Sequence, residues 1–290
     1  MGCGLSSSRH SSRLAARLPG ALVLMLMLAP VLLFSVYPVA VLVANSFGVG
    51  ISPAGGGFTL EHYGRAVASK SVASALGNSV LIAFGSVSIS LGLVLPIVLR
   101  EGDRRKAAGS SVTDAVLTLP IALPGIIVGF FAIVVVGRTG LLALLWEGLS
   151  GFSYLFGGML LAYVYFSFPR VLGPLRGAAA SLDPALAECA RTLGASRLRV
   201  FATVTFPILL PAIIEACATA TAVALGGYGT VATLSEGLRL LPLNVVNELT
   251  TGYKLADSST LAVILALAAV AAILAGRFLS RCTARAVSRT

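Results

Sequence analysis

The sequence contains few charged residues. Only 11% of its 290 residues are Asp, Glu, Lys or Arg, whereas 57% are hydrophobic. A water-soluble domain usually carries about 25% charged residues, so this composition excludes an ordinary soluble globule. Several uncharged runs are long enough to cross a hydrocarbon core, which needs about 20 helical residues. The sequence therefore predicts an all-α integral membrane protein.

Histidine and cysteine are also scarce. His10 and His62 lie far apart and without a cluster of Cys or carboxylate residues, so their spacing does not indicate a metal site. There is no G-x-S-x-G elbow and no plausible triad containing His. The four cysteines fall in segments expected to be cytoplasmic or intramembrane, where disulfides are uncommon: Cys3, Cys189, Cys217 and Cys282. We therefore expect no metal and no catalytic site.

Basic residues outnumber acidic ones and give a formal net charge of +10. A nucleic-acid-binding protein would gather Lys and Arg on one polar face, whereas here they separate hydrophobic segments, so no nucleic-acid partner is expected. Cytoplasmic loops of membrane proteins retain Lys and Arg. With the N-terminus inside, 16 of the 21 basic residues, Arg170 included, fall in segments assigned to the cytoplasm. Both termini are therefore predicted to be cytoplasmic.

Six apolar segments are expected to span the membrane: residues 18–44, 76–99, 112–136, 154–175, 206–225 and 258–276. They define one transmembrane domain, residues 18–279, between cytoplasmic tails at 1–17 and 280–290. The first segment is too long for a signal-peptide core of about 7 to 15 residues. The external segments 45–75 and 226–257 look structured, and either could carry a short helix.

Glycines and prolines inside the third segment suggest how it packs. Gly125-x-x-x-Gly129 would let another helix approach closely. Pro120 and Pro124 each remove a helical donor and favour a kink, although helix bundles also tolerate proline.

The connection between the fourth and fifth segments has the marks of a short capped helix. Asp183 can cap the first amides, Pro184 suits the first helical position, and Gly194 can adopt the left-handed conformation that ends the helix. Apolar residues recur there at spacings of three and four: Leu182, Leu186, Ala190 and Leu193. A second helix could start at Ser196 and run into the membrane at Pro207. Such a helix pair is suited to docking against a partner.

This connection resembles the E-A-A loop of the inner-membrane components of binding-protein-dependent ABC importers, whose pattern is E-A-A, three residues, G, nine residues, I-x-L-P. Glu188, Ala190, Gly194 and Pro207 fall in register. Three positions depart from the pattern with small or apolar residues: Cys189, Val204 and Phe206. The resemblance implies the six-helix permease bundle of a type I importer in a bacterial inner membrane, with the coupling loop at residues 181–207.

The resemblance also implies partners. The loop would sit in a cleft of an ATP-binding cassette subunit, with Glu188 at the contact and Gly194 setting the bend. A second permease subunit, identical or homologous, would complete the path, and an extracytoplasmic solute-binding protein would deliver the solute. No Gly-Lys pair occurs in the chain, so it has no G-x-x-x-x-G-K-[ST] phosphate loop. We therefore expect no cofactor on this chain, with ATP and Mg bound and hydrolysed by the partner.

Glu215 is the acid that stands out within a predicted span. An acid at a helix centre costs about 2.5 to 3.5 kcal/mol on insertion scales, so it should face protein or water. It could line the path for a cation, or it could be a structural partner of an Arg, a hydroxyl or a backbone group, which we favour. Three acids fall in the segments expected to be external, where they could attract a cation or, as we favour, only solvate the loop: Glu236, Glu248 and Asp257.

The solute and the transport class remain open from the sequence. Residues 226–229 and the last span resemble the importer branch that handles polyamines, ferric iron, sulfate or phosphonates. Glu215 and the external acids favour a polyamine-like cation, with sulfate, phosphonate or ferric iron as alternatives. A stand-alone secondary transporter and a membrane-embedded enzyme would also explain the hydrophobicity, but neither explains the capped helix.

Overall fold

The computed structural model describes residues 8–50, 57–103, 111–145, 148, 151–235 and 238–287. All its regular elements in these ranges are helical. The long helices are α1 (Ser8–Ser46), α3 (Lys70–Asp103), α7 (Phe156–Ala180), α10 (Phe206–Leu225) and α13 (Leu255–Val287). The third predicted span is divided between α4 (Ser111–Ala122) and α5 (Gly125–Val136). The six predicted spans therefore each correspond to helical segments, and the all-α prediction is confirmed.

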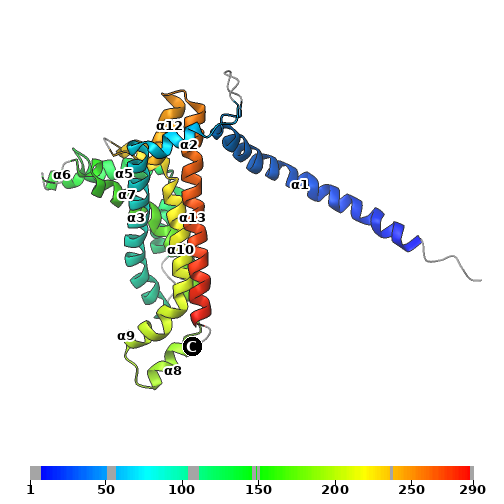
Figure 1. The fold of residues 1–290 in the computed structure, drawn as a ribbon. Coiled ribbons are helices and arrows are strands. Elements are labelled where there is room, and N and C mark those ends of the chain that lie inside the picture. Colours follow the sequence, from blue (N-terminus) through cyan, green and yellow to red (C-terminus); the bar gives the residue numbers. More distant parts are fainter. Residues whose placement is uncertain are drawn as a thin grey trace, which may run out of the picture.

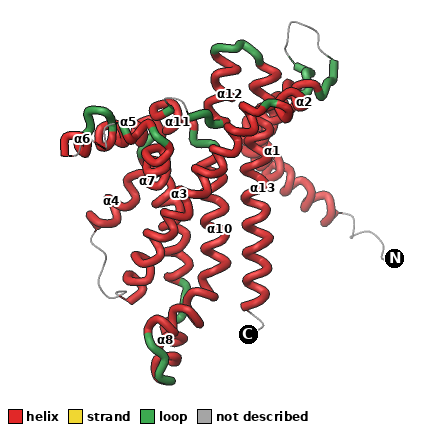
Figure 2. Tube along the Cα trace, turned by 60° about the vertical axis from the view of Figure 1, so that its left-hand side comes forward, coloured by secondary structure: helices red, strands yellow, loops and turns green. Residues whose placement is uncertain are grey.

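Short helices occupy the two ends of the bundle. At one end, called here the α12 end, lie α2 (Glu61–Ala68), α6 (Leu141–Leu145), α11 (Tyr228–Leu234) and α12 (Leu241–Thr250). The opposite end, called the α8 end, carries α8 (Pro184–Thr192) and α9 (Arg197–Val200), and α13 ends there too (Figures 1 and 2). The short helices predicted within 45–75 and 226–257 are thus confirmed.

Five segments are long and apolar enough to cross a membrane by length and composition: Leu26–Ser46, Lys70–Arg100, Gly125–Leu145, Arg197–Leu225 and Leu255–Ala286. The remaining long helix, α7, is not among these five segments, and it contains Arg170, Pro169 and Pro174. Its length of 25 residues still suffices for a crossing, which needs about 20.

Proline interrupts the helix at one point in the third span. Pro124 has φ −56° and ψ 143°, so α4 ends and α5 starts in a new direction. The proline ring disfavours the helical conformation of the residue before it, which explains the break. Pro120, by contrast, stays inside α4. The predicted kink is confirmed and lies at Pro124.

The core has two layers along the bundle. Towards the α12 end, Met159 and Tyr163 of α7 are buried with Leu234 of α11. Towards the α8 end, Leu172 of α7 and Leu209 of α10 are buried together with α3 residues. Helices α3, α7 and α10 therefore form the centre of the core, and α13 packs against α10.

Helix α1 lies apart from this core. It leaves the bundle near α2 and α13 and points away from it (Figure 1). Every side chain from Leu26 to Ala40 is exposed. In a membrane protein such an apolar surface is covered by lipid or by another subunit.

Candidate functional site

Helix α8 has the capped ends that the sequence predicts. The Asp183 Oδ1 atom accepts a hydrogen bond from the backbone N–H of Ala185 at 2.9 Å, and Pro184 occupies the first turn. Gly194 has φ +85°, a left-handed conformation that costs a residue with a side chain more than it costs glycine. The start, the end and the bend of this helix are therefore confirmed.

A second short helix, α9, connects α8 to α10. The Ser196 Oγ atom accepts a hydrogen bond from the Arg199 backbone N–H at 3.4 Å and starts α9. A single π-helical turn, Phe201–Thr205, then leads into α10, where Pro207 lies in the first turn. The predicted second helix is present, but it is shorter and changes to a π turn before Pro207.

The outer surface of α8 and the bend is uncovered. Glu188 is exposed, and so are three leucines of this region, at 48% for Leu186, 89% for Leu193 and 77% for Leu198. Ala190 is half-buried. This region extends beyond the ends of α10 and α13 (Figures 1 and 2). The structure therefore brings Glu188, Ala190 and Gly194 together on a protruding surface, whereas Pro207 lies at its root.

Replacement of Asp183 by Ala is expected to loosen α8 without affecting the spans. Loss of such a cap typically costs a helix about 0.5 to 2 kcal/mol. Amides in the first turn of α8 should therefore exchange with deuterium faster in D183A. Ser181→Ala is the matched control, because the Ser181 hydroxyl donates to Ala178 and does not cap α8. Equal exchange in D183A and the parent protein would contradict the capping role.

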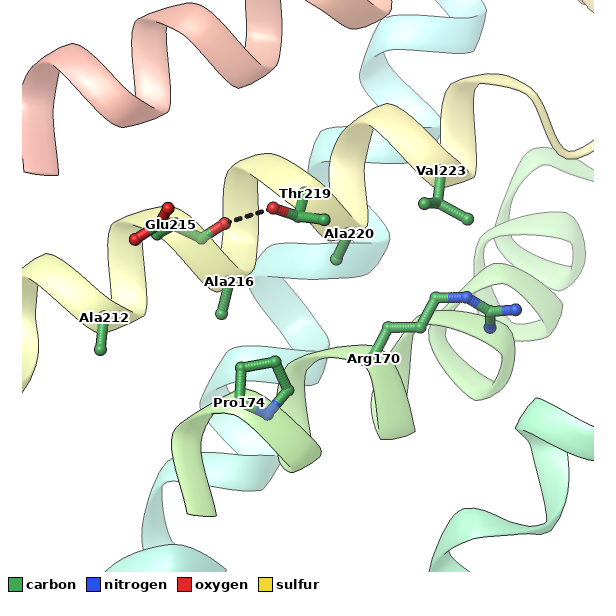
Figure 3. Close-up of a pocket in the computed structure, with 8 residues that line it drawn as sticks. All are labelled: Arg170, Pro174, Ala212, Glu215, Ala216, Thr219, Ala220 and Val223. Atoms are coloured by element: carbon green, nitrogen blue, oxygen red, sulfur yellow. Dashed lines mark hydrogen bonds between the residues drawn. The ribbon is translucent and has the colours of Figure 1, made fainter. Parts of the chain in front are cut away.

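A pocket of about 480 Å³ opens between α7 and α10 in the middle of the bundle. Its lining residues are Arg170, Pro174, Ala212, Glu215, Ala216, Thr219, Ala220 and Val223 (Figure 3). Glu215 is exposed, and its carboxylate makes no hydrogen bond or ion pair within the described chain; the Thr219 hydroxyl donates instead to the Glu215 backbone carbonyl at 2.8 Å. Among the described residues of this chain, the Glu215 carboxylate thus has none of the structural partners that the sequence favours.

Arg170 is the residue of this pocket that sequence reasoning missed. It was assigned to the cytoplasmic side, but it lies inside α7 between the buried residues Pro169 and Val171. The Arg170 Cζ atom lies 3.7 Å from the centroid of the Phe166 ring, and an Arg170 amino group donates to the Phe166 carbonyl. An arginine inside an apolar run was the signal that could have identified it.

The acids at the α12 end are engaged by basic residues. Asp257 lies 2.7 Å from His62 Nδ1 and 3.3 Å from an Arg65 nitrogen. Glu248 lies 3.9 Å from Lys254 Nζ. Glu236 lies outside the described residues. The two acids that can be placed are therefore not a free anionic surface for a cation.

No group of three His, Cys, Asp or Glu side chains that could hold a metal occurs among the residues described. A family model, described as the binding-protein-dependent transport system inner membrane component, matches residues 88–289. The chain belongs to this family. The matched range includes α8, the bend at Gly194 and both helices of the pocket.

Two transport permeases are similar to this chain in sequence. The molybdenum transport system permease protein ModB of Escherichia coli K12 is 38% identical over 133 residues, 45% of this chain and 58% of that protein. A probable sulfate transport system permease protein, cysT of Prototheca wickerhamii, is 36% identical over 138 residues, 47% of this chain and 54% of that protein. The match thus spans little more than half the length of these relatives.

The fold is shared with a solved importer. A bacterial ABC transporter involved in the import of the acidic polysaccharide alginate superposes with a TM-score of 0.71, covering 94% of this chain and 98% of that chain at 18% identity. The type I permease fold predicted from the sequence is therefore confirmed. The likeness concerns the fold alone, because the identity is low.

Proposed function

We propose that this chain is the membrane-spanning subunit of an ATP-driven, binding-protein-dependent importer, and that α8 is the element that couples it to an ATP-binding cassette subunit. The observation that carries this proposal is the protruding helix with both ends capped and its leucines uncovered. Exposed apolar side chains around a charged residue are typical of an interface. The chain lacks a phosphate loop, so a partner would bind and hydrolyse ATP with its Mg.

The connection from α8 into the membrane suggests how force would be transmitted. Caps at Asp183 and Ser196 make the two short helices stiff, and the π turn at Phe201–Thr205 joins them directly to α10. A displacement of α8 by the ATPase would therefore move α10 and with it Glu215. In this scheme Glu188 contacts the ATPase, Ala190 fits the cleft, Gly194 fixes the bend and Pro207 starts the moving span.

A second permease subunit would complete the path, and a solute-binding protein would dock at the α12 end. The apolar side chains of α1 are exposed along the helix, which supports the idea that α1 contacts lipid or the second subunit. We place the α8 end and both termini in the cytoplasm of a bacterial cell, at the inner membrane. Moving Arg170 into the membrane leaves 15 of the 21 basic residues on that side, so the charge bias persists.

We propose a tetrahedral oxyanion, molybdate or sulfate, as the solute. The similarity to molybdenum and sulfate permeases supports it. The polyamine-like cation favoured from the sequence has no such support. The structure also weakens the case for a cation, because Asp257 and Glu248 are paired with basic residues. Of the acids that favoured a cation and can be placed, Glu215 alone has no ion-pair partner among the described residues.

Reconstitution tests this function. The chain is incorporated into proteoliposomes with the ATPase and the solute-binding protein encoded nearest to it, and uptake of radioactive molybdate, sulfate and spermidine is measured with and without ATP. ATP-dependent accumulation of an oxyanion but not of spermidine is expected. Spermidine uptake would overturn the oxyanion proposal, and ion-driven uptake by the chain alone would overturn the importer proposal in favour of a secondary transporter.

A further inference from the structure

Two opposite charges line the pocket between α7 and α10 without pairing with each other. Arg170 comes from α7 and Glu215 from α10 (Figure 3). Ion pairs of the described residues join other partners, for example Arg176 and Asp114 at 3.0 Å, but none includes Arg170 or Glu215. Two unpaired charges inside membrane-spanning helices are costly and are retained where they serve a path or a ligand.

The Arg170 side chain is held in place, but not all of its hydrogen-bond donors are used. Its guanidinium lies against the face of the Phe166 ring, and one amino group donates to the Phe166 carbonyl. A guanidinium has five N–H donors in a planar fork, so donors remain for another acceptor. The close ring contact and the backbone bond restrict its rotamers, which reduces the entropy lost when a ligand binds.

The rest of the pocket is largely apolar. Apart from Arg170, Glu215 and Thr219, the lining side chains are small or apolar: Pro174, Ala212, Ala216, Ala220 and Val223. The volume of about 480 Å³ lies within the range of small-molecule sites. Apolar walls strengthen the attraction between a guanidinium and an anion, because they lower the local dielectric constant. Arginine forks match the paired oxygens of oxyanions.

We propose that this pocket is an anion-binding site within the transport path, in which Arg170 binds an oxyanion through paired N–H···O hydrogen bonds. This inference rests on the proposed function and adds the residue that touches the solute in transit. Figure 3 shows Arg170 extending along the pocket towards Val223, whereas Glu215 lies beside Ala212 and Ala216. The anion therefore binds near the Val223 end of the pocket.

Glu215 keeps this binding weak. A path must bind its solute well enough for entry and loosely enough for release, and a carboxylate in the same pocket repels an anion. Because Glu215 is carried by α10, which continues from α8 and α9 through the π turn, movement of α8 changes the position of Glu215 relative to Arg170. Glu215 thus acts as the release element of the site.

Protection from chemical modification tests the contact in the wild-type protein. The detergent-solubilised complex with its ATPase is treated with the arginine reagent phenylglyoxal, with molybdate or with chloride at equal ionic strength, and labelling is followed by peptide mass spectrometry. Molybdate is expected to slow the labelling of Arg170 at least threefold. The exposed Arg281 of α13 is the internal control and should not respond. Equal Arg170 labelling with and without molybdate would overturn the site.

Transport by variants gives a second measurement. Arg170→Met is expected to lower ATP-dependent oxyanion uptake at least tenfold, Arg170→Lys should fall between it and the wild type, and Arg281→Gln serves as the matched control with unchanged uptake. Glu215→Gln should strengthen the protection of Arg170 by molybdate. Wild-type uptake by Arg170→Met overturns the inference, as does weaker protection in Glu215→Gln. If Arg170→Met does not insert into the membrane, uptake by Arg170→Lys and the labelling of the wild-type protein still test the anion site.

These outcomes separate the inference from the proposed function. If the wild-type complex shows no ATP-dependent oxyanion uptake, the proposed function fails. If wild-type uptake is present but Arg170 is neither protected by molybdate nor needed for uptake, only the inference fails.

Discussion

Reversing the charge of Glu188 is expected to abolish ATP-driven uptake while leaving the protein inserted in the membrane. Glu188 is exposed on α8, the element that protrudes from the bundle. Its carboxylate takes part in no hydrogen bond or ion pair found among the described residues. A lysine at this position would place an opposite charge in the interface proposed with the ATPase, and unfavourable juxtapositions of charge at interfaces cost several kcal/mol. We expect uptake to fall at least tenfold, which corresponds to about 1.4 kcal/mol or more.

Co-purification of the ATPase with the tagged permease measures this effect directly. Glu61→Lys is the control, because Glu61 is likewise an exposed acid but lies on α2 at the α12 end, where it is 3.7 Å from Arg65. The control should retain the ATPase, and Glu188→Lys should lose it while still sedimenting with membranes. Retention of the ATPase and full uptake in Glu188→Lys would remove α8 from the coupling scheme.

Adding one methyl group at Gly129 is expected to destabilise the α12 end of the bundle. A Cβ atom there would lie 1.7 Å from Thr233 Oγ1 and 2.9 Å from Thr233 Cβ. Rotation of the hydroxyl can relieve the first clash, but the second requires α11 to move away from α5. That movement also disturbs the hydrogen bond at 3.2 Å from the Thr230 hydroxyl to the Gly125 carbonyl. Overpacking of this kind usually costs about 1 to 3 kcal/mol.

Thermal unfolding in detergent checks the effect of Gly129→Ala against Gly92→Ala. Gly92 lies within α3, and a Cβ atom built on it meets nothing within 4 Å. Alanine in a helix interior is favoured over glycine by about 1 kcal/mol, so Gly92→Ala should keep or raise the midpoint of unfolding, whereas Gly129→Ala should lower it. Equal midpoints for the two variants would show that α5 and α11 do not depend on this close approach.

Helix α8 could be predicted from sequence because its determinants are local. Asp183 and Pro184 act on the first turn that follows them, and Gly194 acts at the bend where it stands. Capping bonds join atoms within three residues of one another, so no knowledge of distant packing was needed. The close approach at Gly125 and Gly129 was also predictable as a tendency, although its partner, α11, was not.

The pocket could not be predicted in the same way. Arg170 and Glu215 are 45 positions apart, and their shared pocket depends on how α7 packs against α10. The sequence favours a structural partner for Glu215, because no second intramembrane acid lies clearly alongside it, and the count of basic residues includes Arg170 on the cytoplasmic side. An apolar run does not indicate which of its faces meets a cavity, so neither residue could be assigned to the pocket from the sequence.

The sequence by itself determined that the chain is an all-helical membrane protein, where its apolar segments lie and where the capped helix begins and bends. Hydrophobic length and capping chemistry are properties of neighbouring residues, so they can be read along one dimension. The tertiary structure alone decided that the third span changes direction at Pro124 and that α11 packs against its glycines. It also decided that Glu248 and Asp257 are paired, and that Arg170 and Glu215 line one pocket without an ion pair to any described residue. These features arise from contacts between segments far apart in the chain, which depend on the packing of all the helices together.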